Sequence, residues 1–129
     1  MSQNKINIAL LLGDPSGIGP ELVSKLLKEE ITNKANLIII GEKNIFEEGN
    51  KISGYSHELK TVNSFEEIDF KSKNRFFLDI SKGKNHHYKI AEPSKESGES
   101  ILEALYLALK LAKTNKLMRS ILLHLTKLV

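Results

Sequence analysis

The feature that most constrains the fold of this chain is a glycine-rich segment, Gly13–Glu21, between two apolar stretches. Its sequence, GDPSGIGPE, holds three glycines and two prolines in nine residues, a composition typical of a tight turn. The run before it, Ile6–Leu12, is short, apolar and rich in branched residues, which predicts a strand buried on both faces. Pro20 suits the first turn of a helix, where its missing N–H costs no hydrogen bond. The segment therefore predicts a sharp corner between a strand and a helix.

A second apolar run extends this corner into a strand–helix–strand unit. Leu37–Ile40 followed by Gly41 repeats the buried-strand pattern, with residues 33–36 as the connection. Strands joined by a helix run parallel and need helices on the faces of their sheet. We therefore predict an α/β fold, a sandwich around a parallel sheet, and the 129 residues form one folding unit. The apolar face of the first helix is predicted at helical spacing from Leu22, Val23, Leu26 and Leu27.

The rest of the pattern is uneven along the chain. Between Glu42 and Asn74, glycines and polar residues interrupt every period, and only a short strand at Leu59–Val62 is indicated. Phe76–Ile80 predicts a better strand, and Lys82–Asn85 predicts a loop. The longest periodic segment begins at residues 94–97 and predicts an amphipathic helix. Its apolar positions are Ile101, Leu105, Ala108, Leu109 and Ala112.

The glycine corner is also the candidate functional site. Glycine has no Cβ, so Gly17 and Gly19 let the backbone bend tightly or let a ligand approach it closely. Backbone amides at the start of the following helix favour anions, so a phosphate or a carboxylate could bind nearby. The spacing matches neither the dinucleotide-binding fingerprint nor the Walker phosphate loop, so neither mechanism carries over. The alternative is a corner that only connects the strand to the helix.

The candidate cofactor-binding residues at this corner are Gly13, Asp14, Gly17 and Gly19. Asp14 is a candidate polar contact to a cofactor or substrate, and equally a candidate cap of the turn. Glu21 is more simply explained as an acidic residue that complements the positive end of the helix.

Composition and charge exclude several classes of function. No cysteine is present, which excludes disulfides, thiolate metal sites and a cysteine nucleophile. The net charge is +3, and all of the excess lies after Glu103, where five basic residues and no acid occur. Tyr106 is the only aromatic residue of that stretch, so nucleic-acid binding is not favoured. The N-terminal apolar run is too short for a membrane span and unlike a signal peptide, so we expect a cytoplasmic protein that does not bind membranes.

The four histidines do not suggest a metal site. His57 and the adjacent His86 and His87 lie in polar segments, and His124 lies near the end of the chain. Adjacent side chains in extended backbone point to opposite sides and rarely bind one ion. We therefore interpret these histidines as solvated loop residues, and we predict no metal ligand and no catalytic residue in this chain.

Two segments resemble a known enzyme family. GDPSGIGPE after a hydrophobic strand, and SKESGESILEALYLALKLAKTNKL at residues 94–117, are similar to the 4-hydroxythreonine-4-phosphate dehydrogenase family of vitamin B6 biosynthesis. The resemblance implies a fold related to the isocitrate and isopropylmalate dehydrogenases. It also implies a homodimer that oxidises and decarboxylates a phosphorylated hydroxy amino acid with NAD and a divalent metal. Close relatives act on 4-phosphorylated threonate-type acids, and nothing in this sequence separates the two substrates.

The departures from the family are as informative as the match. Family members are much longer, and their three metal-binding histidines, phosphate-binding residues and Asn-Lys active-site segment lie beyond the matching part. NAD and the divalent metal are expected in the full-length family, and neither is expected to bind this chain tightly. We expect the chain to be inactive by itself. The alternatives are a stand-alone anion-binding module, or a separate chain that supplies the missing part.

The segment 117–129 is atypical of the family, whereas 1–116 is interpreted as the N-terminal portion of a dehydrogenase α/β domain. The family would continue with Asp-Ala, a short buried strand and Ala-Pro-hydrophobic-Asn-Lys. One choice of codons for 117–129 recovers Asp-Ala and Phe-Ala-Pro-Phe-Asn-Lys in a shifted reading frame. The resulting hypothesis is a frameshift near Lys116, which would remove the next central strand of the sheet. The alternative is an amphipathic terminal helix or strand at Ile121–Val129.

Overall fold

The computed structural model describes residues 6–69, 75–88, 92, 94–114 and 118–121. Its centre is a five-stranded parallel sheet with the strand order β3-β4-β2-β1-β5. The strands are β1 (Ile6–Leu11), β2 (Ala35–Gly41), β3 (Lys60–Val62), β4 (Phe76–Asp79) and β5 (Met118–Ile121). The helices are α1 (Gly19–Leu27), α2 (Lys43–Ser53) and α3 (Lys95–Thr114), with 3₁₀ turns η1 (Glu30–Lys34) and η2 (Phe65–Glu67).

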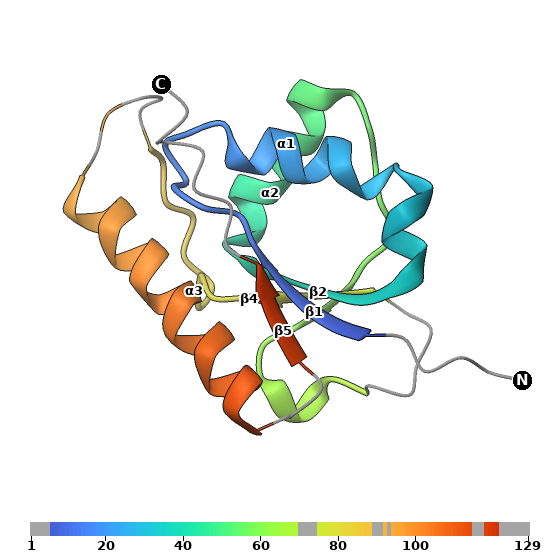
Figure 1. The fold of residues 1–129 in the computed structure, drawn as a ribbon. Coiled ribbons are helices and arrows are strands. Elements are labelled where there is room, and N and C mark those ends of the chain that lie inside the picture. The colour runs from blue at the N-terminus through green and yellow to red at the C-terminus, as the bar shows by residue number, and fades with distance from the viewer. Residues whose placement is uncertain (1–5, 70–74, 89–91, 93, 115–117, 122–129) are drawn as a thin grey trace, which may run out of the picture.

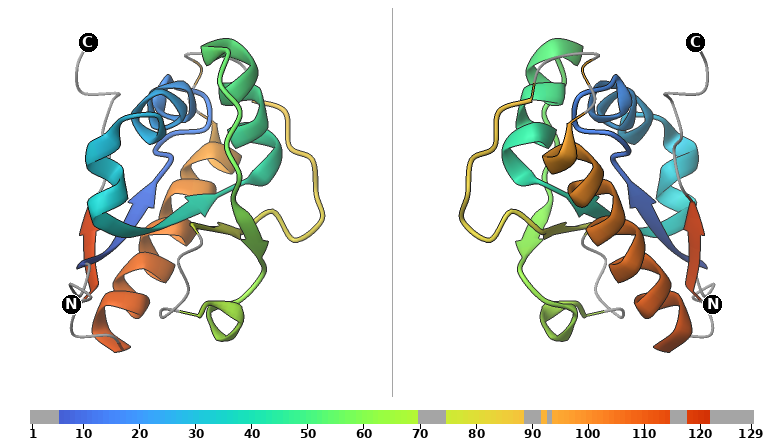
Figure 2. Two further views of the ribbon diagram at one scale, coloured as in Figure 1. Left: turned by 90° about the vertical axis from the view of Figure 1, so that its right-hand side faces the viewer. Right: turned by 90° about the vertical axis from the view of Figure 1, so that its left-hand side faces the viewer.

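Helices cover both faces of the sheet (Figure 1, Figure 2). α1 and α2 lie on one face, and α3 crosses the other face. Because side chains alternate along a strand, each buried strand supplies apolar groups to both faces. In β2, Leu37 and Ile39 pack toward α1 and α2, whereas Ile38 and Ile40 pack toward α3. This arrangement confirms the predicted α/β sandwich with a parallel sheet.

An apolar cluster joins the sheet to α1 and α2. Val23 and Leu27 of α1 are buried in it, as predicted, but Leu26 is 37% exposed. Phe46 of α2 stacks on Phe77 of β4 with 5.0 Å between the ring centroids. Full burial of side chains of this size contributes about 1.5–3 kcal/mol each, so this cluster is a main source of stability.

Helix α3 begins at the predicted position, but only part of its predicted apolar face packs against the sheet. Of the predicted apolar positions whose side chains are described, only Ala108 is fully buried, and Leu109 is 57% exposed. Small residues let a helix approach its neighbour closely, which favours an alanine face against the sheet. The side chains that pack there are Ala104, Leu105, Leu107, Ala108 and Leu111. Neither α3 nor any other helix in the described ranges is long and apolar enough to cross a membrane.

The sequence pattern does not predict α2, because few of its side chains are apolar. Ile45 and Phe46 are its buried apolar side chains, and Gly49 is buried with them. A Cβ at Gly49 would lie 2.6 Å from the backbone carbonyl carbon of Pro20, at the start of α1. Gly49 therefore permits the close contact between α1 and α2. This contact packs α2 against the start of α1, where the glycine corner ends.

The sheet continues on the far side of β1. Met118–Ile121 form β5, which pairs in parallel with β1 from Asn7 to Leu10. The expectation that a changed reading frame leaves this place in the sheet without a strand is therefore wrong. The rest of 117–129, including most of the proposed terminal helix or strand, lies outside the described residues, and the frameshift hypothesis itself stays a prediction.

Arg75 ties the start of β4 to the end of α1. Its guanidinium donates hydrogen bonds to the carbonyl oxygen of Leu27 at 2.9 Å, to the hydroxyl of Thr32 at 2.6 Å and to Oδ1 of Asn33 at 2.7 Å. Partial burial lowers the pKa of Arg75 below its ordinary value, yet arginine remains charged at neutral pH. The contacts connect the 3₁₀ turn η1 to the sheet.

Replacing Gly49 by alanine tests the helix contact. We expect Gly49→Ala to lower the free energy of unfolding by about 1–3 kcal/mol, because the methyl group meets the backbone of Pro20. Gly98→Ala is the matched control, since a Cβ at Gly98 in α3 meets nothing within 4 Å and alanine raises helix propensity by up to about 1 kcal/mol. Urea unfolding followed by circular dichroism measures both. Equal midpoints for the two variants would contradict the packing described.

Removing the guanidinium of Arg75 tests the second contact. Arg75→Met leaves the carbonyl of Leu27 and the side chain of Thr32 without this donor, and we expect a loss of about 1–3 kcal/mol in unfolding free energy. Lys25→Met is the control, because the Lys25–Glu21 ion pair is exposed and should change stability by less than about 0.5 kcal/mol. Urea midpoints that fall in the reverse order would refute this role.

Candidate functional site

The carboxyl ends of the strands lie together at one edge of the sheet. Because the strands are parallel, the carboxyl ends of β1, β2 and β4 meet there. β2 continues into α2 on one face of the sheet, whereas its neighbour β4 leads to α3 on the other face. Neighbouring strands whose connections leave toward opposite faces form a crevice, and ligands of α/β proteins bind at such points. The edge beside β2 and β4 is therefore the candidate site.

The glycine corner lies at the same edge, at the end of β1. Gly13 has a φ of 79°, in the left-handed region that favours glycine. One carboxylate oxygen of Asp14 accepts hydrogen bonds from the amide of Ser16 at 2.9 Å and from its hydroxyl at 2.6 Å. The amide of Gly17 donates to the carbonyl oxygen of Asp14 at 2.9 Å. The side chain and the backbone of Asp14 together close the turn.

These hydrogen bonds confirm the interpretation of Asp14 as a cap of the turn. They hold Gly13, Gly17 and Gly19 in one corner, between the end of β1 and the first residue of α1. Contact of any of these four residues with a cofactor or substrate is not tested by the geometry and stays a prediction.

The start of α1 offers fewer free amides than a helix without proline. Pro20 lies in the first turn and has no N–H, so one of the donors that would face an anion is missing. Glu21 forms an ion pair with Lys25 one turn later, at 3.0 Å. This pairing agrees with the simpler explanation of Glu21 as a residue of the helix start.

A buried carboxylate lies at the end of β2. Glu42 follows Gly41 directly, precedes α2 and is 3% exposed. One of its oxygens accepts a hydrogen bond from Nδ1 of His86 at 2.5 Å. The other accepts from the hydroxyl groups of Tyr88 at 2.7 Å and Ser100 at 2.8 Å. Because a buried carboxylate is costly without such donors, Glu42 ties together β2, the chain after β4 and the early part of α3.

Two further side chains hold the same region. Nδ2 of Asn44, at the start of α2, donates to the backbone carbonyl oxygen of His86 at 2.9 Å. Oδ1 of Asp79, the last residue of β4, accepts from the amides of Lys43 at 3.2 Å and Ser81 at 3.0 Å. The first turn of α2 is thereby connected to the chain that follows β4.

Tyr88 acts as a donor in this cluster at neutral pH. Burial and the hydrogen bond to Glu42 raise the pKa of Tyr88 above its ordinary value of about 10. The phenol therefore remains protonated, and its proton is available to the carboxylate. The cluster combines one carboxylate with an imidazole and two hydroxyl groups.

The structure corrects the interpretation of two histidines as solvated loop residues. Besides His86, His57 is held by the buried Ser24 of α1, whose carbonyl oxygen accepts a hydrogen bond from Nε2 at 2.7 Å. His87 is exposed, as expected, and His124 lies outside the described residues. Within the part of the chain that the structure covers, no group of three or more His, Asp or Glu residues could hold a metal ion.

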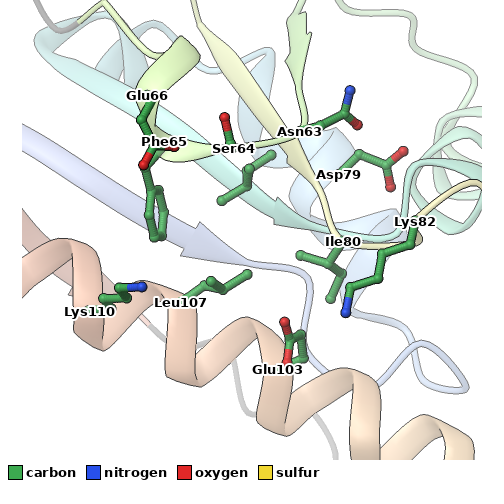
Figure 3. A pocket seen from close by; sticks show the side chains of 11 residues that line it. Asn63, Ser64, Phe65, Glu66, Asp79, Ile80, Lys82, Glu103, Leu107 and Lys110 are labelled. Atoms are coloured by element: carbon green, nitrogen blue, oxygen red, sulfur yellow. The ribbon is translucent and has the colours of Figure 1, made fainter.

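A separate pocket of about 250 Å³ opens between the ends of β3 and β4 and helix α3 (Figure 3). Phe65, Leu78, Ile80 and Leu107 form its apolar part. Its other lining residues are neutral polar groups and charges of both signs, and none belongs to the glycine corner or donates to Glu42, although Asp79 also contacts the start of α2. They are Asn63, Ser64, Glu66, Asp79, Lys82, Glu103 and Lys110. Mixed charge gives the pocket no preference for an anionic ligand, so we do not place the site there.

The sequence analysis missed Glu42 as a candidate residue. Its partners follow it by 44 to 58 positions, and no local pattern connects them. One signal was available: a carboxylate directly after a buried strand ends on the edge where parallel sheets bind ligands.

Comparisons with known proteins identify the relatives of this chain, although no family model matches it. A Pasteurella multocida protein assigned as a 4-hydroxythreonine-4-phosphate dehydrogenase is 36% identical over 112 residues, which cover 84% of this chain and 33% of that protein. A Fusobacterium nucleatum protein assigned as a D-threonate 4-phosphate dehydrogenase is 36% identical over 64 residues, 49% of this chain and 19% of that protein. The crystal structure of a Burkholderia phymatum 4-hydroxythreonine-4-phosphate dehydrogenase aligns with a TM-score of 0.76 at 19% identity, over 92% of this chain and 36% of that one.

The structural match confirms the expected isocitrate dehydrogenase-like α/β fold. The chain spans about a third of the length of the relatives it matches. The agreement nevertheless extends over most of this chain, in sequence and in fold. On these grounds the chain corresponds to a fragment of the 4-hydroxythreonine-4-phosphate dehydrogenase family, about one third of the length of the members it matches.

Proposed function

We propose that this chain contributes one wall of the active-site cleft to an NAD-dependent dehydrogenase of phosphorylated hydroxy acids. The observation that carries the proposal is the glycine corner. Its turn is closed by Asp14 at the carboxyl edge of the sheet, in a chain 36% identical to a protein assigned to this activity. Gly13, Asp14, Gly17 and Gly19 are the residues proposed to border the cofactor or the substrate.

The proposed reaction converts 4-hydroxythreonine 4-phosphate into a ketone and then removes carbon dioxide. NAD bound beside the glycine corner would supply the acceptor for the hydride of the carbon that carries the hydroxyl group, and this oxidation would also release the hydroxyl proton. The carboxylate β to the new ketone then leaves as carbon dioxide. In this chain, Gly17 and Gly19 would let the cofactor or substrate approach the backbone closely, because no Cβ intervenes.

The divalent metal that the family resemblance implies does not fit the described residues, which offer no group of three suitable ligands. We therefore derive no step through the metal. The part of the relatives that this chain does not span would supply its ligands, and we propose accordingly that the chain is inactive by itself and binds neither NAD nor metal tightly.

D-threonate 4-phosphate is the second candidate substrate. The Fusobacterium nucleatum relative assigned to that substrate is 36% identical over about half of this chain, and this similarity supports D-threonate 4-phosphate as a candidate. A stand-alone anion-binding module is the remaining alternative. Titration of the 129-residue protein with NAD, inorganic phosphate and Mg²⁺ distinguishes this alternative from the proposed function. A stand-alone module would bind one of the three saturably.

The assembly and the location of the parent enzyme are also proposals. The resemblance implies a homodimer with a phosphorylated small molecule as substrate. From composition and the N-terminal sequence we further propose a cytoplasmic protein with no nucleic acid or membrane as partner. The proposed frameshift near Lys116 is tested separately, because the genomic DNA downstream of codon 116 either continues the family sequence in the shifted frame or does not.

A chimeric enzyme tests the proposed activity. Residues 1–116 of this chain replace the matching third of the Pasteurella multocida relative, and NADH formation is measured with each of the two phosphorylated acids in the presence of Mg²⁺ or Mn²⁺. We expect turnover of one acid, with the parental relative as the positive control. A folded chimera without NAD-linked turnover of either acid, beside an active parent, would contradict the proposal.

Asp14→Ala in the same chimera tests the corner. The turn loses two hydrogen bonds, the glycines move, and we expect kcat/KM to fall by about 10- to 100-fold. Glu21→Gln is the matched control, because it removes an acid from the same segment but only a surface ion pair, and less than a twofold change is expected. Equal activity of the two variants would remove the corner from the proposed cleft.

A further inference from the structure

His86 is held in one orientation by two residues of another element. Its Nδ1 bonds to Glu42, at the end of β2, and its backbone carbonyl accepts from Asn44, in the first turn of α2. Glu42 is itself fixed, because Tyr88 and Ser100 donate to its other oxygen. A side chain fastened at the ring and at the backbone loses little further freedom when it acts on a ligand.

The hydrogen bond to Glu42 also determines where the imidazole carries its proton. An ionised carboxylate only accepts hydrogen bonds, so Nδ1 of His86 must donate. The hydroxyl groups of Tyr88 and Ser100 donate to the other oxygen of Glu42, and Tyr88 keeps its proton because its pKa is raised. In neutral His86 the second nitrogen, Nε2, is therefore unprotonated. Nε2 has no hydrogen-bond partner among the residues that the structure describes.

The exposure of the ring completes the arrangement. The side chain of Glu42 is only 3% exposed, whereas the side chain of His86 is 38% exposed. Nδ1 contacts the buried carboxylate, so Nε2 lies on the side of the ring away from that contact. A carboxylate that orients an imidazole and makes its second nitrogen more basic is a recurring arrangement in proton transfer and metal binding. No third metal ligand is described here, which favours proton transfer.

The dyad lies where the topology places ligands. Glu42 directly follows β2, and His86 belongs to the chain that leaves the neighbouring β4 toward α3 on the opposite face. This is the crevice defined above, on the edge that also carries the glycine corner. A ligand bound at this edge meets the exposed side of the His86 ring.

We propose that Glu42 and His86 form a preorganised proton-accepting dyad, in which Nε2 of His86 takes the proton of an alcohol group on a ligand bound at this edge. The O–H bond of the alcohol breaks, its proton joins Nε2, and the resulting imidazolium keeps its Nδ1–H bond to Glu42. Where the ligand is the substrate of the proposed function, the carbon–hydrogen electron pair leaves as hydride to NAD. The identity of the alcohol thus rests on the proposed function, whereas the dyad does not.

The first test uses the full 129-residue chain and needs no activity. Long-range ¹H–¹⁵N correlation at pH 8 should show neutral His86 with the proton on Nδ1. Diethyl pyrocarbonate, which acylates unprotonated imidazole nitrogens, should modify His86 at Nε2. His87, exposed and next in sequence, is the internal reference, and mass spectrometry of the peptides gives each rate.

Glu42→Gln should then lower the acylation rate of His86 by about tenfold relative to His87, because the negative charge behind Nδ1 is lost. Tyr88→Phe and Ser100→Ala keep the Glu42–His86 pair and should leave that ratio above the value for Glu42→Gln. If Glu42→Gln fails to fold, the tautomer of the wild-type protein decides. A proton on Nε2 of neutral His86, or an unchanged rate ratio in folded Glu42→Gln, would overturn the dyad.

The second test uses the chimeric enzyme. His86→Gln should lower kcat by about 100-fold or more with a small change in KM, whereas His87→Gln should leave both unchanged. If the proposed function is wrong, the chimera without this substitution is inactive. The tautomer and the acylation rates then still test the dyad. Full activity of His86→Gln in an active chimera would refute the role in alcohol deprotonation.

Discussion

Parallel pairing of β1, β2 and β4 is the constraint on which the rest of this structure depends. Parallel strands need crossover helices, and these helices must cover both faces because each strand is buried on both sides. The register of β1 on β2, from Ile6 opposite Ala35 to Leu11 opposite Ile40, brings the glycine corner level with Glu42. The glycine corner and Glu42 therefore lie at the same edge of the sheet, although they are far apart in the sequence.

Local physics explains how much of the fold could be predicted. The apolar runs at Ile6–Leu12 and Leu37–Ile40 and the corner between them predicted β1, α1 and β2, because each element is specified by its own residues. α2 could not be predicted in this way, since it exists through contacts made at a distance: Phe46 stacks on Phe77, and Gly49 admits the backbone of Pro20. The predicted face of α3 was only partly right: Leu105 and Ala108 pack against the sheet, whereas Leu109 is exposed and Ala104 and Leu111 are buried instead.

The candidate site likewise has one part that the sequence predicted and one part that it did not. The corner and the turn-capping role of Asp14 follow from residues within four positions of one another, and the hydrogen bonds of Asp14 confirm the latter. The Glu42 cluster depends on three segments that only the tertiary fold brings together, so His86 looked like a loop histidine. A single sequence does not reveal a pair of a buried carboxylate and an exposed imidazole. Each of the two residues lies in a polar segment that shows no pattern of its own.

The central claim is that the carboxyl edge of the sheet, between the glycine corner and the Glu42–His86 dyad, faces the reacting ligand. A crystal structure of the chimeric enzyme with NAD bound tests it most directly. We expect the dinucleotide or the substrate to contact the backbone of residues 13–19 and to approach the exposed side of His86. A ligand seated instead in the pocket beside α3, or at the amino ends of the strands, would contradict it.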